Sequence, residues 1–191
     1  LTSTTPNQFY FNQALLRDTA YEMQLPNSIK KIHEVIVMAY KKALETRPHD
    51  PRYYEIGYHL EKAGQPKEAI EFYLKAAETA RKNYQNEKAL EYYTKVLTGI
   101  SEEKSTLSYI NILTDIFKLQ TIIGKWKEAL KTAEGAVNLA QKNTSMVYMA
   151  KAYKLLGEYQ LLSGEYFEAK KHLLRAESYY TAANDQEGLI E

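Results

Sequence analysis

The sequence contains no cysteine, which excludes disulfide bonds, thiolate metal ligands and a cysteine nucleophile. Glycine and proline are also scarce, with 8 and 5 residues among 191. No apolar run approaches the roughly 20 residues that a membrane-spanning helix needs. No charged segment followed by an apolar run opens the chain, so its start does not resemble a secretory signal. We therefore expect a cytoplasmic protein with no membrane partner.

Charge of either sign is not in excess, because 25 Lys and Arg against 24 Asp and Glu give a formal net charge of +1. A dedicated binder of nucleic acid or of an anionic membrane usually shows a clear basic excess. The composition therefore predicts no nucleic-acid partner.

The 17 tyrosines leave two interpretations open. They are either the large packing residues of helices, or a surface that stacks bases or binds a partner.

Apolar residues recur at spacings of three and four, which is the period of a helix with one buried face, and strand-like alternation is nearly absent. Pro51 and Pro66 suit the first turn of a helix. Three glycines stand where a helix must end and the chain reverse, at Gly64, Gly124 and Gly164. We expect a short strand or extended lead-in over 7–11, and helices over 12–23, 28–46, 51–63, 66–83, 86–99, 103–123, 126–141, 145–163 and 166–181. Most connections are short, so neighbouring helices are expected to be antiparallel.

Three stretches that end at Ala69, Ala129 and Ala169 share a glycine five residues before the alanine, and a fourth stretch that ends at Ala89 lacks the glycine. Ala89, Ala129 and Ala169 follow one another at intervals of 40 residues. Small side chains let two antiparallel helices approach closely, and a helix pair cannot bury its apolar stripe alone. The repeat therefore predicts stacked helix hairpins.

These positions resemble the tetratricopeptide repeat (TPR). The matching residues are Tyr53, Ile56, Gly57, Leu60, Gly64, Ala69, Tyr73 and Ala76; Tyr153, Leu156, Gly157, Gly164, Ala169 and Ala176; and Leu113, Ile116, Gly124, Ala129 and Ala136. Phe117 stands where the family usually has glycine, so it should push apart or tilt the two helices of its hairpin. The resemblance implies an all-α fold, an antiparallel helix-hairpin solenoid that winds as a right-handed superhelix. Its period of about 40 residues exceeds the usual 34, which implies longer helices.

The array begins out of phase, because Ala69 precedes Ala89 by 20 residues, half a period. Helix 66–83 should therefore pair with 51–63 and also with 86–99. We expect a junction segment over 1–46 and a TPR-like repeat domain over 47–191. Leu1 is not Met, and residues 180–191 look like a turn into another helix, so we expect a fragment that is truncated at the C-terminus. A homodimer through the exposed C-terminal end face is one open possibility.

The N-terminal segment resembles a junction in large bacterial signalling ATPases of the AAA/STAND type, which joins the nucleotide-binding module to a TPR tail. The matching residues are Phe9, Phe11, Leu15, Arg17, Asp18, Ala20, Tyr21, Glu22 and His33. Gln13 departs from the pattern, since histidine is usual there. In that family the tail is often attached to an adenylate or guanylate cyclase, a kinase or a transcription-factor domain. The resemblance thus implies a regulatory part of a larger signal-transduction ATPase or cyclase.

No pattern in the sequence indicates catalysis. The histidines His33, His49, His59 and His172 lack the spacing of a zinc-ligand pair. No phosphate-binding loop occurs, since Gly124-Lys125 is followed by Trp126 and lacks the upstream glycine. Alternating Glu and Lys read as solvated pairs on helix surfaces. We predict no catalytic residue, no metal site and no cofactor, and hence no enzyme.

The resemblance does predict a partner-binding groove. Carried onto the 40-residue register, the groove-facing positions of the family are Glu71, Lys75, Glu78, Lys82, Asn111, Thr114, Asp115, Lys118, Lys151, Lys154, Leu155 and Glu158. The lysine and asparagine set that clamps chaperone C-terminal carboxylates in some relatives is not reproduced. We expect an interaction module for a protein or peptide partner, or for another domain of the same chain. A single-stranded RNA binder, disfavoured by the charge, and a self-association module are the alternatives.

Overall fold

The computed structural model describes residues 2–5, 8–10, 18, 19, 21, 23, 25–46, 52–100, 106–186 and 188. The chain forms two compact units, Leu1–Phe72 and Tyr73–Glu191. The helix α4 (Pro66–Lys82) belongs partly to each. The domain boundary expected between residues 46 and 47 lies at the edge of residues outside the described set, and it stays a prediction.

The first unit opens with a small antiparallel ribbon of β1 (Thr2–Thr5) and β2 (Gln8–Tyr10), in which Thr2 lies opposite Tyr10. The strand expected over 7–11 is thus present at its centre. Of the helix expected over 12–23, residues 18, 19 and 21 are helical, and most of the others lie outside the described residues. Two longer helices follow, α2 (Pro26–Thr46) and α3 (Tyr53–Lys62), which pack against each other.

Two helix starts in this unit differ from the prediction. Helix α2 begins at Pro26 and not at residue 28, because proline fits the first turn and the Leu25 carbonyl accepts from the amides of Ser28 and Ile29 at 2.8 and 3.1 Å. Helix α3 begins at Tyr53, two residues later than predicted. Arg52 takes the cap position before it without a side-chain cap bond.

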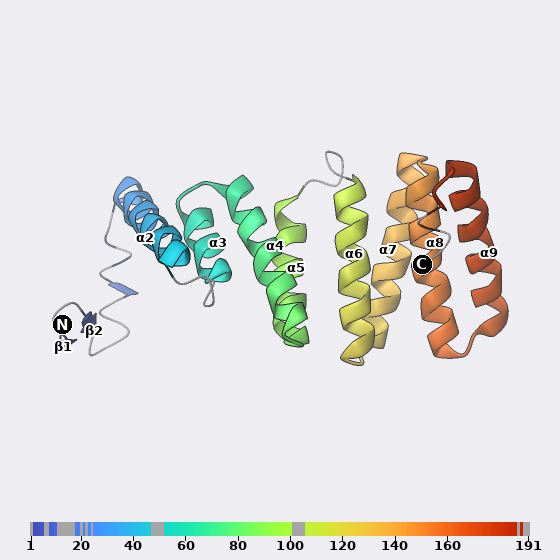
Figure 1. Cartoon of the computed structure of the whole chain (residues 1–191), viewed down its shortest axis with the longest axis horizontal. Helices are drawn as coiled ribbons and strands as arrows, with labels where there is room; N and C mark the ends of the chain where they lie inside the picture. The colour runs from blue at the N-terminus through green and yellow to red at the C-terminus, as the bar shows by residue number, and fades with distance from the viewer. Residues whose placement is uncertain are drawn as a thin grey trace. The chain divides into compact units, whose positions relative to one another are not determined.

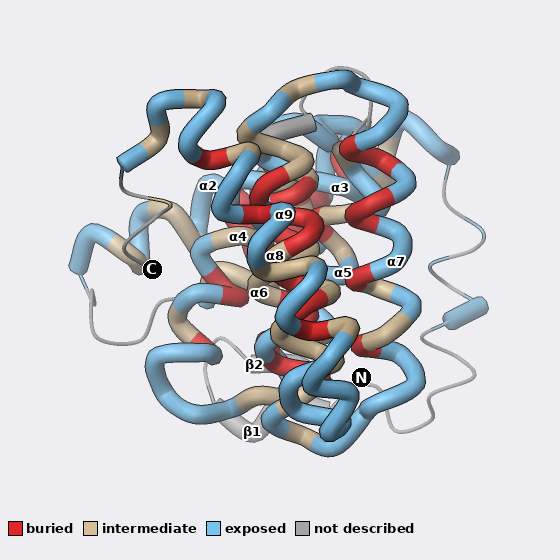
Figure 2. The backbone as a smooth tube through the Cα atoms, turned by 90° about the vertical axis from the view of Figure 1, so that its right-hand side faces the viewer, coloured by how far each residue is buried: buried red, intermediate tan, exposed pale blue. Residues whose placement is uncertain are grey.

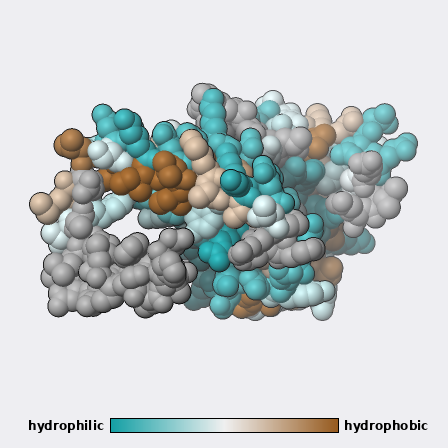
Figure 3. Space-filling view, turned by 60° about the vertical axis from the view of Figure 1, so that its left-hand side comes forward, coloured by the Kyte–Doolittle hydropathy of each residue, from teal (hydrophilic) through white to brown (hydrophobic). Residues whose placement is uncertain are grey.

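The core of the first unit contains Val37 from α2 with Ile56 and Leu60 from α3, all buried. Helix α2 also carries large apolar side chains that solvent reaches, among them Ile32 and Val35. Figure 3, turned so that the left-hand side of Figure 1 comes forward, shows a group of hydrophobic residues in brown on this face.

The second unit continues from α4 with five helices, which are α5 (Asn86–Gly99), α6 (Thr106–Ile122), α7 (Trp126–Asn143), α8 (Met146–Ser163) and α9 (Tyr166–Ala183). Figure 1 shows α6 to α9 side by side in chain order. The 40-residue register is confirmed, because α5, α7 and α9 begin at residues 86, 126 and 166. Ala89, Ala129 and Ala169 are all buried where these helices meet their neighbours.

The turns between helices show why glycine recurs. Gly64, Gly124 and Gly164 have φ of +79°, +77° and +84°, in the left-handed region that glycine adopts without steric cost. Tyr84 takes the equivalent place between α4 and α5 with φ of +56°. Since the amide of Gln85 still donates to the Ala80 carbonyl at 2.9 Å, the same helix end forms without the glycine.

Small and aromatic side chains share the core of the second unit. Helix α7 turns Ala129, Ala133, Ala136 and Ala140 toward its neighbours, each fully buried. Phe117 from α6 fills the space beside them. Figure 2 shows the buried residues in red on the facing sides of these helices and the exposed ones in pale blue outside. Small side chains on α7 and a bulky ring from α6 therefore build this core together.

Outside the ribbon of β1 and β2, every described element is a helix, which confirms the all-helical class. Helices α8 and α9 are in more extensive contact than α6 and α7. That Phe117 pushes apart or tilts the helices of its hairpin stays a prediction. Among the residues that the structure describes, no helix combines the length and the apolar character required to cross a bilayer.

Candidate partner-binding groove

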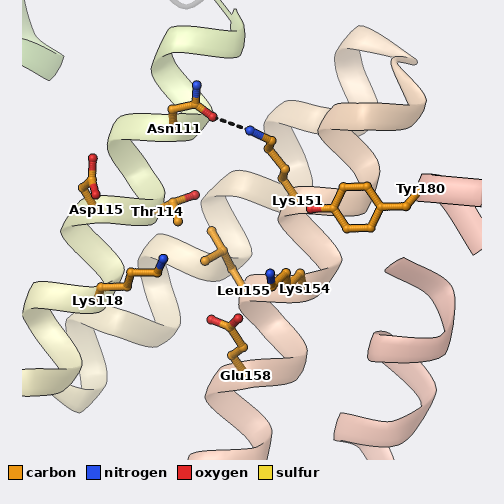
Figure 4. A pocket seen from close by; sticks show the side chains of 9 residues that line it. All are labelled: Asn111, Thr114, Asp115, Lys118, Lys151, Lys154, Leu155, Glu158 and Tyr180. Carbon is orange, nitrogen blue, oxygen red and sulfur yellow. Dashed lines mark hydrogen bonds between the residues drawn. The ribbon is translucent and has the colours of Figure 1, made fainter. Parts of the chain in front are cut away.

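Helices α6 and α8 border a hollow of about 270 Å³ on the surface of the second unit. It is lined by Asn111, Thr114, Asp115, Lys118, Lys151, Lys154, Leu155, Glu158 and Tyr180. We call this hollow the α6–α8 groove. It brings together eight of the twelve predicted residues, and their role in binding stays a prediction. Figure 4 shows the lining side chains on α6 and α8, with Tyr180 reaching in from α9.

The repeat explains why these residues meet. Each lining position on α6 has its equivalent 40 residues later on α8, so the two helices present the same face. The ammonium group of Lys151 donates to the side-chain oxygen of its equivalent Asn111 at 2.7 Å (Figure 4). This bond ties the two walls of the groove together near one end.

The floor of the groove is more apolar than its walls. Leu155 and Tyr180 are 2% and 4% exposed, so they form a packed base. The hydroxyl group of Thr114 donates to the Ile110 carbonyl at 3.0 Å. Its proton is therefore engaged, and its oxygen is left to accept a hydrogen bond from a ligand.

Asp115 is the carboxylate of the groove with a perturbed pKa. Burial raises its pKa, while the positive charges of Arg81 and Lys118 and a hydrogen bond from Tyr93 act in the opposite direction. Burial, and then the charge of Asp115, raise the pKa of Tyr93 to about 12, so its hydroxyl keeps the proton that it donates to Asp115. The lining holds three lysines and two carboxylates, an excess of one positive charge.

The four predicted residues on α4 do not line the groove. Glu71, Lys75, Glu78 and Lys82 are all exposed. Glu78 nevertheless acts on the groove through its charge, which raises the pKa of both Asp115 and Tyr93. Glu71 belongs to the first unit. Tyr180 is the lining residue that the sequence analysis missed, because it lies on α9, whereas the predicted positions lie on α4, α6 and α8.

A pair of histidines in the first unit also escaped prediction. The Nδ1 atoms of His33 on α2 and His59 on α3 lie 2.7 Å apart, and the Tyr21 hydroxyl lies 3.0 Å from Nε2 of His33. One ring must donate and the other accept, so the pair cannot carry a proton on both facing nitrogens. The two residues are 26 apart on different helices, a separation that carries no sequence signal.

The environment of this histidine pair favours the neutral rings. Burial, followed by the charge of Lys62, lowers the pKa of His33. Burial, followed by the charge of His33, lowers the pKa of His59, while Glu55 opposes the shift. Within the described part of the chain, no group of three or more His, Asp or Glu side chains is placed to hold a metal ion.

No protein-family model and no curated protein matches the chain. Solved structures do. A crystal structure of MamA is 15% identical, with 85% of this chain and 98% of that chain covered and a TM-score of 0.49. A second crystal structure contains the nearly identical TPR-like repeats of a candidate kinesin light chain from Podosopora anserina. Its sequence is 14% identical to this chain, and the match covers 92% of this chain and all of that chain with a TM-score of 0.52. The second likeness shows a TPR-like fold, and at this identity it shows the fold alone.

Proposed function

We propose that the chain is a non-catalytic interaction module that binds an extended polypeptide segment in the α6–α8 groove. The observation that carries the proposal is the convergence of two equivalent helix faces on one polar hollow with a packed floor. The segment comes from another protein or from another domain of the same chain.

The lining indicates how such a segment is recognised. Asn111 and Thr114 offer amide and hydroxyl groups that can bind backbone amides whatever the ligand sequence. Lys118 and Glu158 stand at equivalent positions with opposite charge, so ligand side chains of both signs find partners. Because these groups are partly solvated, binding should weaken as salt rises.

A displayed library of random peptides, selected on the immobilised protein, tests the proposal. We expect enriched peptides whose affinity falls at least about tenfold when Asn111, Lys118 and Lys151 are all changed to Ala. The matched control changes Asn138, Lys127 and Lys131, which are exposed on α7, to Ala and should leave binding intact. Absence of enrichment, or equal binding by the groove variant, would overturn the proposal.

We also propose that the module is the regulatory tail of a larger cytoplasmic signal-transduction ATPase or cyclase. The support is the sequence resemblance of residues 9–34 to the junction in AAA/STAND ATPases. The complete reading frame that contains this chain tests the idea. A phosphate-binding loop and its nucleotide-binding module upstream of residue 1 are expected, and a frame without them would contradict this part of the proposal while leaving the groove untouched.

A further inference from the structure

The outward face of α9 carries an unusual mixture of side chains. Within one stripe of the helix lie Tyr166, Phe167, Lys170, Leu173, Leu174 and Glu177. Phe167 and Leu174 are 82% and 54% exposed. All of these residues except Phe167 line a shallow hollow of about 350 Å³ between α8 and α9. We call this stripe the α9 face.

The same stripe is built differently in the other two repeats. On α7 the central positions are the half-buried Leu130 and the buried Val137. The exposed flank of the stripe carries Lys127 and Glu134. Helix α5 follows the same plan, with apolar residues in the centre and polar ones on the flank.

On α9 the pattern is inverted. Lys170 and Glu177 occupy the central positions, and Phe167 and Leu174 occupy the flank. A further repeat of the α5 and α7 type, packed on this face, would bury both charges without a partner, which is costly. Lys170 and Glu177 cannot satisfy each other, because seven residues of helix separate them by roughly 10 Å along the axis.

We propose that the α9 face binds the α9 face of a second copy of this chain, with the two helices antiparallel. A two-fold axis between Leu173 and Leu174 sets Lys170 of each copy against Glu177 of the other. Leu174 of each copy then lies beside the two-fold axis, and the aromatic side chains close the sides. A parallel arrangement would set like charges together, so the charge pattern selects the antiparallel one.

The size of the face limits the strength of the dimer. One helix from each copy buries less than the roughly 1,200–2,000 Å² typical of stable complexes. We therefore expect a weak dimer, in which monomer and dimer exchange with concentration.

Sedimentation velocity over a concentration series through the micromolar range tests the dimer. Phe167→Lys with Leu174→Glu places the α7 residues at the equivalent α9 positions, where the repeat already tolerates them. This double variant should stay folded by circular dichroism and remain monomeric at all concentrations. A wild-type protein that is monomeric throughout the series would overturn the proposal, and so would a dimer that survives these two changes.

Charge reversal tests the register. Lys170→Glu and Glu177→Lys, made singly, should each weaken dimerisation about tenfold or more, because like charges then face each other. The two changes together restore opposite pairs and should recover wild-type dimerisation. The control reverses the exposed residues Lys131 and Glu134 on α7 and should leave the dimer unchanged. Failure of the double reversal to recover dimerisation would overturn the antiparallel register.

Discussion

The hairpins α6–α7 and α8–α9 share one register, and they pack differently. Phe117 of α6 and Gly157 of α8 occupy the same position, twelve residues before the buried alanine of the next helix. At Gly157 an added Cβ atom would lie 2.7 Å from Cγ of Leu173, so α9 lies directly on the α8 backbone. At Phe117 a buried ring fills the space instead, and α6 and α7 are in less extensive contact.

The polar contacts of the two hairpins repeat with one substitution. Gln120 of α6 accepts a hydrogen bond from Thr132 of α7 at 2.8 Å. At the equivalent positions, Gln160 of α8 pairs with Nδ1 of His172 of α9 at 2.7 Å. The histidine also stacks on Tyr153, with ring centroids 5.7 Å apart.

The comparison teaches that the register and the packing are separable. Buried alanines and turn residues keep the 40-residue period in both hairpins, while one side chain decides how closely the helices approach. The predictions below change one hairpin toward the other, remove a residue that distinguishes them, or change a turn that belongs to the same register. Urea denaturation, followed by circular dichroism, measures the free energy of unfolding in each case.

The largest effect is expected from Phe117→Ala. The ring is 2% exposed and packs among the alanines of α7, so its removal leaves a cavity and should lower the free energy of unfolding by about 4 kcal/mol. Phe167→Ala is the control, since this ring is 82% exposed, and in dilute solution it should change stability little. A loss below about 1 kcal/mol for Phe117→Ala would mean that α6 and α7 close the gap, contrary to our account.

Gly157→Ala should cost about 1–2 kcal/mol, because the new methyl group forces Leu173 away from α8. Gly135→Ala on α7 is the matched control, since an added Cβ there meets no atom within 4 Å. That change should raise stability by about 0.5–1 kcal/mol through helix propensity. Equal effects of the two substitutions would show that the close approach of α8 and α9 does not depend on this glycine.

Tyr84→Gly should raise the free energy of unfolding by about 1 kcal/mol. Tyr84 holds a left-handed conformation at a position where the later turns have glycine, and its side chain is 88% exposed, so little packing is lost. Thr144→Gly is a second case, with φ of +52° at an exposed β-branched residue. A decrease in stability for both variants would contradict the assignment of strain to these turns.

His172 should make the α8–α9 hairpin sensitive to acid. Burial, followed by the charge of Lys171, lowers the pKa of His172 below the usual value for histidine. The unfolded chain therefore binds the proton more readily, and stability falls as the pH falls below about 6.5. His172→Thr installs the residue of the other hairpin, so the difference in stability between wild type and variant should shrink in acid. A difference that does not change with pH would contradict the prediction.

Local chemistry allowed much of the fold to be predicted. The bounds of α5 were predicted to the residue, and the left-handed glycines were placed correctly, because steric preference at a single residue decides such features. The start of α3 was predicted two residues too early, since Arg52 takes the cap position instead. Eight groove residues were predicted together because a repeat carries one helix face into the next at a constant spacing.

The residues that the sequence analysis missed have one feature in common, which is that they make contacts between different helices. Tyr180 enters the groove from α9, and His33 meets His59 from another helix. These contacts depend on the rotation and distance of whole helices, which no local pattern specifies. The inverted pattern of the α9 face was present in the sequence, but only the exposure of Phe167 and Leu174 showed that it lies uncovered in the described chain.

The sequence by itself determined the helical class, the 40-residue register, the turn positions and the polar character of the groove, because these follow from side-chain size, backbone sterics and periodicity along one chain. Only the tertiary structure decided how closely each hairpin packs, which side chains from distant helices complete the groove, and which face of α9 remains exposed. Those properties arise from packing between surfaces, where one side chain such as Phe117 or Gly157 changes the distance between helices without altering the register.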